Sequence, residues 1–92
     1  MYMWTVYEKR SVQKTLRKLP DKIVVRYEAW KRIVEIEGHV GLRKITGFRD
    51  ESLLGKWKGY RSSRLGRKWR VIYHVEKDRL DVFVIEITPH VY

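Results

Sequence analysis

Basic side chains are concentrated between residues 56 and 70, in a stretch that contains no acidic residue. A planar guanidinium can form two parallel hydrogen bonds with a phosphate, and Ser62 and Ser63 add hydroxyl donors of the kind used on phosphates and sugars. A basic run can also be no more than a solvated outer surface. The excess of arginine without carboxylates favours a surface that binds a polyanion, made of Lys56, Lys58, Arg61, Arg64, Arg67, Lys68 and Arg70.

Two residues near the end of the sequence could exchange protons beside that surface. His90 follows Glu86 by four residues, and its imidazole suits proton transfer near neutral pH because its unperturbed pKa is about 6.5. A glutamate can act as a general base, but it can equally neutralise a neighbouring arginine. A histidine at the end of a strand can likewise be a surface residue without chemistry. Both residues are candidates, and residue type alone does not decide between these roles.

The composition excludes several other chemistries. The sequence has no cysteine, which excludes disulfides, thiolate zinc sites and cysteine nucleophiles. Its three histidines, His39, His74 and His90, show no close ligand spacing. We therefore expect neither a metal site nor a cofactor.

Length and charge bound the class of protein. Ninety-two residues are expected to form a single domain, 1–92, around one core. The net charge of +10 points to nucleic acid, an acidic protein or an anionic membrane as partner. No apolar run approaches the ~18 residues of a spanning helix, and the first residues lack the order of a signal peptide. We expect a cytoplasmic protein with no membrane association.

The elements that must position these residues begin with a strand and two helices. Residues 3–8 alternate as in a half-buried strand. Residues 8–19 have apolar positions at helical spacing and end at Pro20: Val12, Leu16 and Leu19. A second helix is predicted from Asp21, as its N-cap, to Gly38, with one apolar face of core residues: Ile23, Tyr27, Trp30 and Val34.

The second half of the sequence predicts a loop and then three strands. Residues 39–55 contain three glycines and are expected to form a loop with a brief helical turn that closes the edge of the core. Strands are predicted at 57–65, 68–76 and 79–88, the last two as a hairpin. Alternation would turn Trp69, Val71 and Tyr73 inward and Arg70, Ile72 and His74 outward. The fold class is therefore α+β in the order β-α-α-β-β-β: a two-helix hairpin on a small, mainly antiparallel four-stranded sheet, with the other sheet face uncovered.

The ordered pattern of the last 36 residues resembles the RelE/ParE superfamily of bacterial toxins. The motif is Ser-x-Arg-Leu, a few residues, Trp-Arg-Val-x-Tyr, a hairpin and a terminal histidine, and its residues here are Ser62, Arg64, Leu65, Trp69, Arg70, Val71, Tyr73 and His90. The first strand, the helical hairpin and the "LLGKWKGY" linker match the family in order and length, so the resemblance covers the whole chain.

The resemblance implies a toxin of a type II toxin–antitoxin system. Its RelE-like and YoeB-like branches cleave mRNA, usually on the translating ribosome, and its ParE-like branch inhibits DNA gyrase. For the nuclease branches it implies that Arg70 holds the scissile phosphate and that His90 is a catalytic acid or base. Tyr92 would stack on or orient a nucleotide. The expected partners are a cognate antitoxin, mRNA and the ribosome, with RNA held by Lys56, Lys58, Arg61, Arg64 and Arg67.

Two features leave the general base open, whereas the pair of His90 and Arg70 argues against the gyrase-inhibitor alternative, because the resemblance implies that the ParE-like branch generally lacks such a set. The paired lysines of RelE are replaced here by Arg61 and Ser63, so a lysine base cannot be carried over. Glu86 is the first candidate for the base, but whether it shares the face of Arg70 depends on the register of the hairpin. A one-residue shift would put Glu86 beside Trp69 instead. We expect a metal-independent endoribonuclease, with a ParE-like binding protein or a silent nucleic-acid binding module as alternatives.

Overall fold

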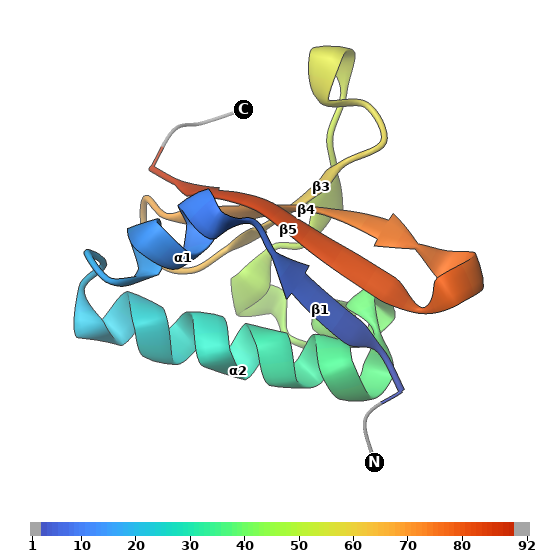
Figure 1. Cartoon of the computed structure of the whole chain (residues 1–92), viewed down its shortest axis with the longest axis horizontal. Helices are drawn as coiled ribbons and strands as arrows, with labels where there is room; N and C mark the ends of the chain where they lie inside the picture. Colours follow the sequence, from blue (N-terminus) through green and yellow to red (C-terminus); the bar gives the residue numbers. More distant parts are fainter. Residues whose placement is uncertain (1–2, 90–92) are drawn as a thin grey trace.

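A mostly antiparallel sheet of five strands forms one layer of the structure, a computed structural model that describes residues 3–89 (Figure 1). The strand order is β1-β5-β4-β3-β2, and only the outer pair of β1 and β5 is parallel. The strands are β1 (Thr5–Glu8), β2 (Glu51–Ser52), β3 (Arg61–Arg64), β4 (Arg70–Glu76) and β5 (Asp81–Thr88). The α+β class and the helix-on-sheet arrangement are confirmed, with one strand more than predicted.

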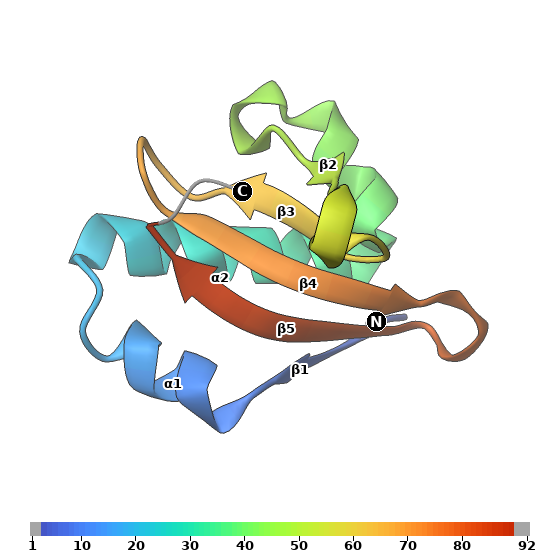
Figure 2. The same ribbon diagram turned by 90° about the horizontal axis from the view of Figure 1, so that it is seen from above.

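The helix α2 (Asp21–Glu37) runs across one face of the sheet (Figures 1 and 2). Its predicted core residues Tyr27, Trp30 and Val34 are fully buried, and Ile23 packs against the same core. The helix ends at Gly38, whose φ of 75° and ψ of −176° belong to a region that is essentially limited to glycine. Asp21 is the first helical residue, because Pro20 occupies the N-cap position.

The first helix, α1 (Arg10–Leu16), is shorter than predicted at both ends. Glu8 belongs to β1, where it pairs with Val84 of β5 and its carboxylate accepts a hydrogen bond from the Tyr27 hydroxyl. At the other end the chain turns after Leu16, where the N–H of Lys18 donates to the carbonyl of Thr15 at 2.9 Å. Leu19 lies beyond the helix but is still buried, so the apolar spacing predicted the core better than the helix boundary.

The connection from α2 to β3 is built from 3₁₀ turns and one very short strand. Leu42 and Phe48, on 3₁₀ turns at His39–Lys44 and Thr46–Phe48, are buried and close the edge of the core as expected. The predicted strand at 57–65 is wrong over its first four residues. Gly55 and Gly59 have φ values of 65° and 97°, and these left-handed conformations break the strand and form a projecting loop. The fifth strand, β2, lies beside β3 (Figure 2).

Candidate functional site

The register of β3, β4 and β5 decides which side chains share the sheet face that α2 leaves uncovered. Directly paired residues of antiparallel strands point to the same side. Arg64, Arg70 and Thr88 form one row across the three strands, and Ser62, Ile72 and Glu86 form the next. The outward direction predicted for Arg70 is confirmed, while Ile72 on the same face is fully buried.

Arg70 of β4 is held in place by side chains of β3, the adjacent strand, and of β2, the strand beyond it. Its Nη1 donates to the hydroxyl of Ser62 at 3.0 Å and lies 3.8 Å from a carboxylate oxygen of Glu51. The side chain is only 15% exposed, whereas that of Glu51 is 57% exposed, so the longer ion contact is weak and screened by solvent. A guanidinium has five N–H donors, and these two contacts leave several of them for an anion.

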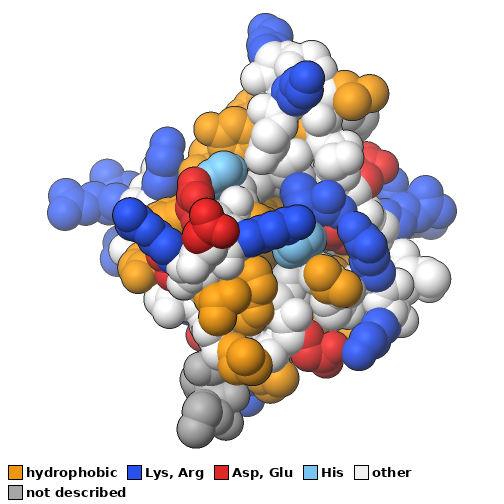
Figure 3. All heavy atoms as spheres, turned by 90° about the vertical axis from the view of Figure 1, so that its right-hand side faces the viewer, with side chains coloured by type: hydrophobic (Ala, Val, Ile, Leu, Met, Phe, Trp, Pro, Cys, Tyr) orange, Lys and Arg blue, Asp and Glu red, His pale blue; other side chains and the backbone are white. Residues whose placement is uncertain are grey.

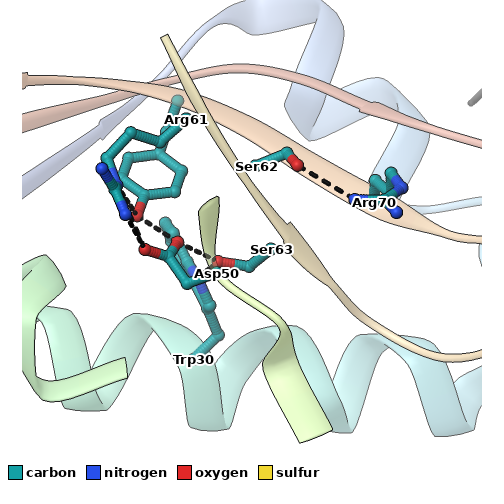
Figure 4. A network of polar contacts seen from close by, with 7 residues as sticks. Trp30, Asp50, Arg61, Ser62, Ser63 and Arg70 are labelled. Carbon is teal, nitrogen blue, oxygen red and sulfur yellow. Dashed lines mark hydrogen bonds and ion pairs between the residues drawn. The ribbon is translucent and has the colours of Figure 1, made fainter. Parts of the chain in front are cut away.

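Arg61 lies on the opposite side of β3, together with Ser63 (Figure 4). Its guanidinium donates to Asp50 at 2.7 and 3.1 Å, and the Asp50 side chain is fully buried. Asp50 also accepts hydrogen bonds from the hydroxyls of Ser63 and Tyr73. The structure therefore does not bring Arg61 to the face of Arg64 and Arg70, contrary to the grouping expected from the sequence.

The Asp50 carboxylate is the centre of a polar network that joins β3 and β4 to α2. Trp30 donates its indole N–H to the hydroxyl of Ser63 at 2.9 Å, and Ser63 in turn donates to Asp50 at 2.7 Å. Burial and the nearby Asp50 charge raise the pKa of Tyr73, so its phenol stays protonated and can donate. This network fixes the position of β3, and thereby of Ser62 and Arg64 on its other side.

The other predicted RNA contacts differ from Arg61 in having no ion pair within residues 3–89: Lys56, Lys58, Arg64 and Arg67. Arg64 is half-buried beside Arg70, and Arg67 is exposed in the turn between β3 and β4. Lys56 and Lys58 are exposed on the projecting loop before β3. Figure 3 shows the end of the molecule with the turn between β4 and β5, where Lys and Arg side chains lie among hydrophobic patches and a few acidic side chains.

Glu86 does share the face of Arg70. It lies opposite Ile72, one row from the pair formed by Arg70 and Thr88, and it is half-buried. Ile72 pairs with Glu86 and Tyr73 pairs with Val84, so Ile85 of β5 is left unpaired in a bulge. This extra residue determines that Glu86 points to the same face as Arg70. The predicted roles of His90 and Tyr92 fall outside the described residues.

Sequence reasoning missed Asp50. The residue lies in a segment expected to be an irregular loop, and its burial comes from strands β3 and β4 that are distant in sequence. The available signal was the alternation of β3, because it separates Arg61 and Ser63 from Ser62 and Arg64. An arginine turned toward the core requires a carboxylate partner there.

Among residues 3–89 no group of three or more histidine, aspartate or glutamate side chains is arranged to hold a metal ion. No helix within that range is both long and apolar enough to cross a membrane.

Comparison with known proteins identifies the fold. Neither a family sequence model nor a curated protein sequence matches the chain. Among solved structures, a chain of the archaeal RelE–RelB complex from Pyrococcus horikoshii is 26% identical with a TM-score of 0.75. The match covers 94% of this chain and 93% of that one.

Two further structures have the same fold at lower identity. A chain of the YoeB–YefM complex from Staphylococcus aureus is 16% identical with a TM-score of 0.73, over 96% of this chain and 98% of that one. A YoeB/ParE toxin from Agrobacterium tumefaciens is 17% identical with a TM-score of 0.71, over 95% and 99%. These two likenesses show the shared fold, and with the helical layer, the strand order and the 26% identity to the Pyrococcus horikoshii chain they support a toxin of the RelE/ParE superfamily.

Proposed function

We propose that this chain is the toxin of a toxin–antitoxin pair and that it cleaves mRNA in the cytoplasm without a metal, in association with the ribosome. The observation that carries the proposal is the positioned guanidinium of Arg70, fixed by Ser62 and flanked by Arg64 on the uncovered face. Two arginines side by side, with no carboxylate pairing Arg64 within residues 3–89, are suited to a phosphodiester.

The reaction would be a transesterification within the RNA. A base removes the proton of a ribose 2′-hydroxyl, and that oxygen forms a bond with the adjacent phosphorus. The bond from phosphorus to the 5′-oxygen of the next nucleotide breaks, and an acid protonates the leaving oxygen. Arg70 would bind the phosphate and stabilise the negative charge that builds up on it in the transition state.

The two proton transfers need two groups. Glu86 is the proposed base, because it shares the face of Arg70 and lies one row from it. His90, two residues after Thr88 in the sequence, is the proposed acid, and Tyr92 would stack on or orient a nucleotide. These last two roles follow from the family resemblance.

The charge of the protein would hold the RNA. Lys56, Lys58, Arg64 and Arg67 are the proposed contacts with phosphates of mRNA or ribosomal RNA. Binding that depends on neutralised phosphates releases counterions, so its affinity should fall steeply with salt concentration. We leave Arg61 out of this set because Asp50 already pairs with it.

A translating extract tests the proposal. Purified protein should cut a reporter mRNA, and primer extension should map the cuts on ribosome-bound and free message. Arg70→Ala should reduce the cutting rate by about 10²- to 10³-fold, the usual effect of removing a donor from a developing negative charge. His90→Ala should reduce it by about 10²- to 10⁴-fold.

Lys22→Ala provides the matched control, because it removes one exposed positive charge from α2, on the other side of the sheet. This variant should cut as fast as the unchanged protein. Circular dichroism must show that all variants are folded. An intact message together with inhibited DNA supercoiling would contradict the nuclease proposal and support a ParE-like gyrase inhibitor.

A cognate antitoxin is the proposed protein partner. The Pyrococcus horikoshii and Staphylococcus aureus structures are complexes with RelB and YefM, and a net charge of +10 suits a partner with an acidic segment. Co-expression with the product of the adjacent gene should yield a complex and suppress cutting. A protein that cuts equally well with and without that product would refute this part of the proposal.

A further inference from the structure

Four rings meet in a continuous series on the uncovered sheet face, away from the arginine row. Tyr7 of β1 stacks on Phe83 of β5 at 5.0 Å with an angle of 14°. Phe83 lies 6.4 Å from the imidazole of His74 on β4, at 30°, and His74 lies 5.8 Å from the ring of Tyr60. The register places Tyr7, Phe83 and His74 directly across from one another on the three strands.

These rings line a shallow hollow of about 340 Å³, which we call the aromatic hollow, with Lys9 at its edge. Such a volume is at the small end of ligand sites and exceeds what a single planar base needs. The Tyr7 side chain is 47% exposed, so an aromatic surface that could be covered by a ligand remains in contact with water. Solvent-exposed rings arranged in this way can stack on another planar group.

The charges around the aromatic hollow favour an anionic ligand. Lys9 is exposed and has no ion pair among the described residues. Glu8, which also lines the hollow, has its carboxylate directed to Tyr27 and Lys31 on the α2 side. The hydrogen bond to Glu76 raises the pKa of His74, but the charged imidazole is paired with that carboxylate, so the positive charge available to a ligand comes from Lys9.

The aromatic hollow and the arginine row belong to one surface. His74 and Arg70 are four residues apart on β4 and point to the same side, a separation of about 13 Å at about 3.3 Å per residue. Ile72 lies between them on that face and is fully buried, so a single strand with its phosphate on Arg70 would reach the rings by passing over the side chains that cover Ile72. Proteins that bind single-stranded nucleic acid combine a positive groove with stacked aromatic side chains in this way.

We propose that the aromatic hollow binds a nucleobase of single-stranded RNA that flanks the phosphate held by Arg70. The inference rests on the proposed function, since it assigns a second position on the same RNA. Stacking accepts any base, so the hollow would position the strand without strict sequence preference. Lys9 would contact the phosphate of that nucleotide.

Binding of a non-cleavable probe tests the proposal independently of catalysis. The probe is a fluorescein-labelled single-stranded oligoribonucleotide with 2′-O-methyl riboses, measured by anisotropy at about 0.15 M ionic strength. Tyr7→Ala should weaken binding about fivefold or more, and Tyr7→Phe, which keeps the ring, should bind as the unchanged protein does. Tyr60→Ala provides a second variant if the first does not fold.

An abasic scan of the probe supplies a measurement that needs no variant. Removing the base at one position should weaken binding to the unchanged protein by a similar factor, and the same change should have little further effect on Tyr7→Ala. Equal binding by all variants and all abasic probes would overturn the inference. The inference would also be overturned if Tyr7→Ala bound the RNA probe normally but no longer bound the antitoxin, because the hollow would then be a protein-docking site. Weaker probe binding by Tyr7→Ala, together with no cutting of mRNA by the unchanged protein, would support the hollow and refute the nuclease proposal.

Discussion

Replacing Arg61 and Arg64 in turn should separate a structural arginine from an RNA-binding one. Arg61→Ala leaves the fully buried Asp50 carboxylate without its charged partner, and such losses cost about 3–5 kcal/mol. Asp50 keeps its bonds from Ser63 and Tyr73, so we expect the low end, about 3 kcal/mol. In a domain of this size that lowers the melting temperature by roughly 12–24 °C.

Arg64→Ala should change the free energy of unfolding by no more than about 0.5 kcal/mol, because Arg64 has no ion pair among the described residues. Urea unfolding, followed by tryptophan fluorescence, measures both variants. In the Asp50→Ala/Arg61→Ala double variant no buried charge is left unpaired, so its loss should be smaller than the sum of the two single losses by about 1–3 kcal/mol.

RNA binding should show the opposite ranking. Arg64→Ala should weaken binding of a single-stranded probe and make it less dependent on salt, while Arg61→Ala should bind nearly normally under conditions where it is folded. The reasoning would be refuted if the two variants were equally stable. It would also be refuted if folded Arg61→Ala lost more affinity for RNA than Arg64→Ala.

Three further outcomes are expected. Gly38→Ala should destabilise the protein by at least about 1–2 kcal/mol in urea unfolding, because φ is 75° and a Cβ would lie 2.7 Å from the Trp4 ring; an unchanged midpoint would contradict this. The hydrogen bond to Glu76 raises the pKa of His74, so its NMR titration midpoint should lie above about 6.5 and fall in Glu76→Gln. The stability from this pair should be present below the unfolded pKa and lost as the pH rises through the folded one, and it should stay below about 1 kcal/mol because the pair is well exposed. Affinity for single-stranded RNA should decrease linearly with salt on a double logarithmic plot, and a flat plot would argue against phosphate contacts.

The core and the order of elements could be predicted because local patterns encode them. Tyr27, Trp30 and Val34 recur at helical spacing, and all three are buried as that spacing predicts. Helix and strand boundaries were less accurate. They depend on tertiary contacts, such as the pairing of Glu8 with β5, and on left-handed residues such as Gly59.

The candidate functional surface was only partly predictable, because its composition depends on which face each strand residue takes. Counting basic residues grouped Arg61 with Arg64. The two residues are three positions apart on β3, and because side chains alternate along a strand they point to opposite faces. The side taken by Glu86 depended on a bulge that skips Ile85, and periodicity in one strand does not reveal a bulge. The buried partner Asp50 comes from a segment without any regular pattern.

The pairing of β1 with β5 has a consequence for the synthesis of this chain. Thr5 is matched with Asp81, and β5 lies between β1 and β4, so the sheet joins the two ends of the polypeptide. A nascent chain that has emerged only as far as β4 lacks β5, the strand that lies between β1 and β4. In such a chain neither the arginine row that includes Thr88 nor the series of rings that includes Phe83 has formed. Long-range pairings of this kind form late. The row of Arg64, Arg70 and Thr88 and the series of rings through Phe83 can therefore form only after β5 has been synthesised.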